Sequence, residues 1–146
     1  HGIFSRTELE ARTQILLEEY VLKVQIEARI AGDLAQNHVI PTAIKYQHQL
    51  VQHLKGLKEL ELEDETTFEA ARNLGEHIQA CQRKNKAMLQ ARKEANQLED
   101  PLEKAKAYQG IRSMIEDIRY HVDKLELLVD DEDWPLPKYR ELLFLR

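Results

Sequence analysis

The sequence predicts an all-α fold, a helical bundle of about four helices with one long antiparallel helical hairpin. Apolar residues recur at steps of three and four along most of the 146 residues, and no segment alternates apolar and polar residues as a strand does. Glycine and proline, which interrupt helices, number 5 and 4. The hydrophobic content of 42% is enough for one core, so residues 1–146 are expected to form a single helical domain.

The first helix is predicted at about residues 6–38. Residues 1–4 are interpreted as a tag remnant or linker that precedes it. Ser5 and Glu8 have the spacing of a capping box, in which the hydroxyl accepts a backbone N–H and the Glu side chain reaches back. The apolar seam of this helix narrows to alanines, so a neighbouring helix can approach it closely.

Pro41 is predicted to interrupt the helical pattern. Proline lacks a backbone N–H and disfavours helical geometry at the preceding residue, so the first helix should end or kink sharply between Asn37 and Pro41. A second helix is expected at about residues 42–57. His38 stands beside the break, where helix carbonyls lack donors, and we expect this corner to be buried, with His38 bonded to protein rather than to a metal.

The third helix is predicted at about residues 66–97. An acidic stretch before it, residues 59–65, is typical of a solvated connection, and either Asp64 or Thr66 can cap the helix. At about 1.5 Å per residue, such a helix extends roughly 48 Å. The third helix can therefore protrude beyond a compact core.

The fourth helix is predicted at about residues 101–129. Asp100 is a favourable cap, Pro101 suits the first helical position, and Glu103 completes the pattern of a helix start. The connection from the third helix is then only a few residues long. The third and fourth helices should form the long antiparallel hairpin.

The C-terminal segment, residues 134–146, is Pro-rich and concentrates aromatic and aliphatic side chains. Prolines reduce the entropy lost on docking, so the segment should fold back on the bundle with Trp134 buried against the fourth or first helix. Lys138 or Arg140 should lie near carboxylates. The structural or interface candidates in this segment are Trp134, Pro135, Pro137, Tyr139 and Arg140.

Composition and charge exclude several classes of function. The net charge is −5 and the charges are interleaved, so no basic stripe exists for nucleic acid. The longest uncharged run, residues 34–44, is too short to cross a membrane. Because Cys81 is the one cysteine, no internal disulfide can form, and a cytoplasmic setting fits best.

Few residue constellations suggest chemistry. Asp117 and His121 stand four apart on one helix, a spacing that suits acid-base work but is more often an ordinary charge pair. His77 and Cys81 have the same spacing, but structural zinc takes four ligands. The sequence has neither the Glu-x-x-His motif of di-iron bundles nor a Gly-rich phosphate loop. We expect this chain to contain no catalytic residue, no cofactor-binding site and no metal site.

Two segments resemble a known family. Residues 26–47 read IEARIAGDLAQNHVIPTAIKYQ, and residues 118–144 read IRYHVDKLELLVDDEDWPLPKYRELLF. Both are similar to the C-terminal region of type III glutamine synthetases, and the likeness extends over nearly the whole chain, most weakly through the third helix. His48 departs from the family pattern, which has Asn at this place. Four further residues in or next to these segments are structural or interface candidates: His38, Pro41, Asp117 and His121.

The resemblance implies a fragment of a longer, cytoplasmic enzyme that joins ammonia to glutamate, with ATP and Mg as its cofactors, in a ring-built homo-oligomer. The catalytic motifs of that family lie upstream of these residues, so this chain on its own is predicted to be inactive. Its partners would be the catalytic domain of the same polypeptide and neighbouring subunits, and the C-terminal segment could contact that domain instead of the bundle.

Two other interpretations stay open. The chain could be a free-standing helical module for protein-protein interaction that uses its long hairpin. It could also be a small enzyme using Asp117 and His121. The reading frame upstream of Ile3 distinguishes these two interpretations from the glutamine synthetase one, because a catalytic domain either precedes this segment or does not.

Overall fold

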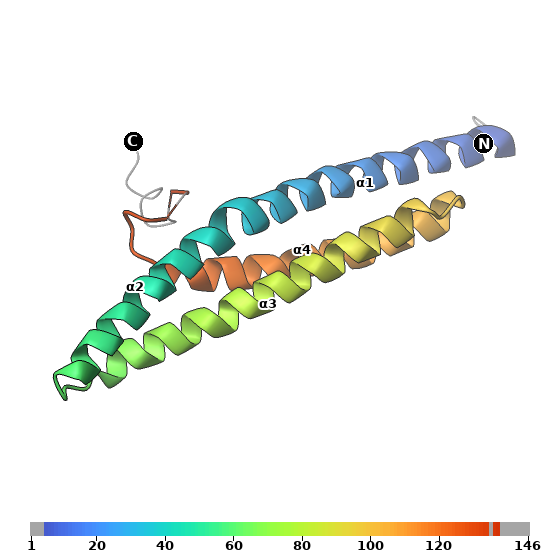
Figure 1. Cartoon of the computed structure of the whole chain (residues 1–146). Helices are drawn as coiled ribbons and strands as arrows, with labels where there is room; N and C mark the ends of the chain where they lie inside the picture. Colours follow the sequence, from blue (N-terminus) through green and yellow to red (C-terminus); the bar gives the residue numbers. More distant parts are fainter. Residues whose placement is uncertain (1–4, 135, 138–146) are drawn as a thin grey trace, which may run out of the picture.

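The computed structural model describes residues 5–134 and 136–137. All elements of the described part are helical, which confirms the all-α prediction. In chain order they are α1 (Arg6–Leu34), the π-helical turn η1 (Ala35–Val39), α2 (Ile40–Glu59), α3 (Glu65–Asn96) and α4 (Pro101–Leu128). Figure 1 shows α1 and α2 as one continuous helix that changes direction between them, with α3 and α4 antiparallel to each other beside it.

The predicted helix end before Pro41 is wrong, and the chain instead stays helical and changes direction at η1 (Figure 1). Leu34, Val39 and Ile40 all have right-handed helical backbone angles, so α1, η1 and α2 are continuous. At η1 the N–H of Ile40 donates to the carbonyl of Ala35, five residues back. This wider turn accommodates Pro41, which has no N–H to donate to the carbonyl four residues earlier. The described part therefore contains three helical rods, not the four that were predicted.

The helix starts follow the predicted caps. The Ser5 hydroxyl and the Glu8 carboxylate form both bonds of the capping box. Asp64, rather than Thr66, caps α3, accepting the Thr67 N–H at 3.0 Å. Asp100 accepts the N–H of Glu103 at 3.0 Å and caps α4.

The turn between α2 and α3 depends on Glu61, which has a left-handed backbone with φ of 58°. The N–H of Glu61 donates to the carbonyl of Lys58 at 3.0 Å, and that of Leu62 donates to Leu57 at 2.9 Å. These two bonds satisfy carbonyls that the last helical turn leaves open, as in a Schellman motif. The left-handed residue reverses the chain so that α3 can return along α2.

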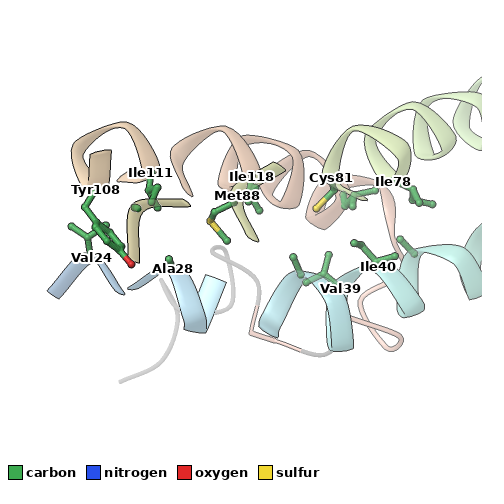
Figure 2. Packing of buried hydrophobic residues seen from close by; sticks show 14 of the residues in the cluster. Val24, Ala28, Val39, Ile40, Ile78, Cys81, Met88, Tyr108, Ile111 and Ile118 are labelled. Carbon is green, nitrogen blue, oxygen red and sulfur yellow. The ribbon is translucent and has the colours of Figure 1, made fainter. Parts of the chain in front are cut away.

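The core lies between the continuous rod and the hairpin (Figure 2). The rod contributes mainly small side chains, including Ala28, Ala35 and Ala43, each fully buried. The hairpin contributes the larger ones, which pack into the space the alanines leave: Leu74, Met88, Tyr108, Ile111, Ile118 and Leu125. The alanine seam predicted from the sequence is thus the line of close approach. In the described part, no helix combines the length and the apolar character needed to cross a membrane.

A polar cluster joins all three rods near the α3–α4 turn. The Tyr108 ring is fully buried, and its hydroxyl donates to the side-chain oxygen of Asn96. Gln25 of α1 donates from its amide to both of these oxygens, each at 3.1 Å. The cluster satisfies the buried hydroxyl and fixes the rotation of α1 on the hairpin.

Candidate functional site

The hairpin brings two histidines together, His77 from α3 and His121 from α4. Their Nδ1 atoms lie 2.9 Å apart, a distance at which one nitrogen donates and the other accepts. At least one ring must be neutral to accept. Partial burial, then the charges of His77 and Lys84, lower the pKa of His121 below its ordinary value of 6.5. The lowered pKa favours the neutral form of His121, in keeping with a hydrogen bond to His77.

Asp117 lies next to this pair but makes another contact. Its carboxylate is 3.9 Å from the ammonium of Lys84 on α3, and both side chains are substantially exposed. The Tyr120 ring meets His121 edge-on, with 5.0 Å between the ring centroids. Asp117 affects His121 electrostatically by raising its pKa, against the larger effects that lower it. His121 thus has a histidine of the neighbouring helix as its hydrogen-bonding partner.

The sequence spacing missed the pairing of His77 with His121, because these residues are far apart along the chain. A usable signal existed. In an antiparallel hairpin, residues equally distant from the connection face each other. His77 lies 20 residues before residue 97, and His121 lies 21 residues after residue 100, the two ends of the connection.

Cys81 stands four residues after His77 on α3, the spacing considered above for zinc. The Cys81 side chain is fully buried in the core, and burial raises the pKa of its thiol to about 11. Such a thiol stays protonated and is a poor nucleophile. Across residues 5–134 and 136–137, no three His, Cys, Asp or Glu side chains gather where they could hold a metal ion.

His38 and Pro41 lie on the surface of the rod. Val39 and Ile40 between them are buried, but the His38 side chain is 51% exposed and lies 3.9 Å from the Asp33 carboxylate. The expectation of a buried corner at residues 37–41 holds only for Val39 and Ile40, and His38 is exposed. Because the helix continues through η1, no corner forms that a histidine could bridge.

At the start of the C-terminal segment, Trp134 is buried as predicted, and most of the segment lies outside the described residues. Trp134 is 7% exposed and belongs to the core, and its N–H donates to the carbonyl of Asp130 at 3.1 Å. Leu136 is half-buried against the same core, whereas Pro137 is exposed. The remaining candidates of this segment lie outside the described residues: Pro135, Lys138, Tyr139 and Arg140.

A groove lies between the end of α2 and the start of α3. Its walls include Leu57, Leu62 and Phe68, and its rim carries both signs of charge. The basic side chains are Lys55, Lys58 and Arg72, and the acidic ones are Glu63, Asp64, Glu65 and Glu69. A rim of mixed charge selects neither an anionic nor a cationic ligand.

A more unusual surface lies on α1. Six large apolar side chains of α1 are more than half exposed, and the spacings of seven, four and four residues place four of them on one stripe. We call this stripe the outer face of α1: Ile15, Leu22, Ile26 and Ile30. At 100° per residue it points away from the buried side of the same helix, which carries Val21, Val24 and Ala28. A helix that is apolar on two opposite sides typically contacts other protein segments on both sides.

Comparison with known proteins shows which proteins the chain resembles. A family profile described as the glutamine synthetase C-terminal domain matches residues 1–58. Over these residues the chain is similar to the C-terminal domain of glutamine synthetases, in agreement with the resemblance noted at residues 26–47.

Three curated relatives align with 99% of this chain. A glutamine synthetase of Bacteroides fragilis (strain YCH46) is 44% identical over 151 residues. A type-3 glutamine synthetase of Dictyostelium discoideum is 26% identical over 156 residues, and a glutamine synthetase of Butyrivibrio fibrisolvens is 24% identical over 147 residues. The aligned region is 21% of each relative, so the chain spans about a fifth of their length.

Proposed function

We propose that the chain is the C-terminal accessory domain of a type III glutamine synthetase. In this proposal the whole enzyme ligates ammonia to glutamate with ATP, and the domain supports the catalytic part or the assembly of subunits. The observation that carries the proposal is the alignment of 99% of the chain with much longer glutamine synthetases, one of them named a type-3 enzyme. The apolar outer face of α1 adds a surface suited to a large partner.

The chemistry of the chain fits an accessory role better than a catalytic one. Mg²⁺ is held by carboxylate oxygens in octahedral geometry, and the described residues do not gather three acidic or histidine side chains at one point. These residues therefore do not fit the metal of an ATP-dependent ligase. In the proposal, ATP and Mg belong to the part of the enzyme outside this chain, and we derive no catalytic step from His77 or His121.

A glutamine-forming assay tests the proposed activity. The full-length polypeptide that contains this sequence is purified beside the 146-residue chain, and both are given glutamate, ammonium, ATP and Mg. The full-length protein should form glutamine only when ATP is present, and the 146-residue chain should form none. Absence of ATP-dependent glutamine formation by a folded full-length protein would contradict the enzymatic part of the proposal.

Activity of the chain by itself would contradict the accessory role. The double variant His77→Ala with His121→Ala provides the control, because it removes the histidine pair. Any glutamine formed by the chain should then be compared with that variant. Equal rates in both would show that the histidine pair does not contribute to that activity.

A further inference from the structure

The outer face of α1 is apolar and elongated, and its four side chains stay exposed among the residues that the structure describes. Its four side chains, Ile15, Leu22, Ile26 and Ile30, are 53%, 56%, 52% and 56% exposed. At about 1.5 Å per residue they extend along roughly 22 Å of helix. Isolated exposed apolar residues are common on protein surfaces, but an aligned row of four is characteristic of a contact surface.

Charged side chains border this row. Lys23 and Arg29 lie on its two sides at 100° per residue, and Glu19 lies between Ile15 and the other three. All three charged residues are exposed. An apolar centre with a charged rim is the usual anatomy of a surface that binds another folded protein. The continuous part of the apolar centre is the stretch from Leu22 to Ile30.

The size of the row restricts what can cover it. A stable complex between separate molecules buries about 800 Å² on each partner, which is more than four half-exposed side chains of one helix supply. A segment joined covalently to α1 needs less area, because the tether holds it at an effective concentration in the millimolar range. The area therefore favours an occupant from the same polypeptide over a second copy of this domain.

We propose that the outer face of α1 is covered by the catalytic part of the same glutamine synthetase polypeptide, within one subunit. This inference rests on the proposed function, and the relatives, about five times longer than this chain, supply the needed partner. The core of the bundle leaves this face free, since α3 and α4 pack on the opposite side of α1. The outer face is then buried in the whole enzyme.

Photo-crosslinking in the full-length protein tests this inference. A benzophenone amino acid is placed at Ile26, and in a control protein at Leu127 of α4, which is 78% exposed. The Ile26 probe should join a peptide from outside this domain in a product with the mass of one polypeptide. Its yield should exceed that of the Leu127 probe at least about fivefold.

Three results would overturn the inference: a product with the mass of two polypeptides, a crosslink confined to this domain, or a yield no higher than that of the control. Ligase activity of the unmodified protein is measured separately. An active enzyme without the crosslink refutes the docking surface and leaves the proposed function standing. A crosslinked but inactive protein refutes the proposed function and leaves the docking surface standing.

A charge placed on the row gives a second readout. In the full-length protein, Ile26→Arg should increase the rate at which a protease releases this domain at least about fivefold, because an apolar contact is replaced by a charge. Leu127→Arg should leave that rate unchanged. Equal release rates in the two variants would contradict a contact at the outer face.

Discussion

Replacing Trp134 by alanine should strongly destabilise the bundle. The side chain is 7% exposed and packs within the core, so the replacement removes a large apolar group and leaves a cavity. Substitutions of this kind cost about 3–5 kcal/mol. For a domain of this size each kcal/mol lowers the Tm by about 3 °C, so we expect a fall of about 10 °C.

Thermal unfolding of the chain, followed by circular dichroism, measures this effect. Leu127→Ala is the matched control, because Leu127 is 78% exposed and its truncation should change stability by less than about 0.5 kcal/mol. Trp134 is the only tryptophan, so fluorescence reports its environment directly. An unchanged Tm in Trp134→Ala, together with the emission wavelength of tryptophan in water, would refute the docking of this segment.

Three further predictions concern the turn and the histidine pair. Glu61→Gly should stabilise the chain by about 1 kcal/mol in urea unfolding, because glycine adopts the left-handed φ of 58° without strain; a loss of stability would contradict this. Asp64→Ala should lower the urea midpoint and Glu63→Ala should not, because Asp64 caps α3; equal midpoints would refute the cap. The lowered pKa of His121 means that the unfolded state binds more protons, so stability should fall as the pH drops below about 6.5. His121→Asn should flatten that pH dependence and His48→Asn should not; identical profiles in the two variants would show that His121 is not its source.

Local rules predicted the helix starts. The caps at Ser5, Asp64 and Asp100 follow from residues only three apart, and the bonds they predict are present. The same rules failed at Pro41, because a proline ends an α-helix but is compatible with the wider turn of η1. Residue spacing alone does not distinguish the end of a helix from a change of helix type.

The candidate site was less predictable than the fold. In the sequence, His77 and His121 each stand four residues from another candidate on the same helix, and the structure joins the two histidines to each other across the hairpin. Their contact depends on the register of α3 against α4, which is set by the whole core. The outer face of α1 went unnoticed for a related reason. Its apolar residues belong to the same helical repeat as the buried ones, and only burial separates the two sides.

The most direct test of the accessory role compares ATP-dependent glutamine formation by the full-length polypeptide with that of a form lacking residues 5–146 of this chain. If the domain supports the catalytic part or the assembly of subunits, its removal should lower the specific activity at least about tenfold, which corresponds to about 1.4 kcal/mol. Sedimentation of both forms shows whether the loss accompanies a change in assembly. Equal specific activity and equal mass per assembly, after correction for the missing residues, would contradict the account.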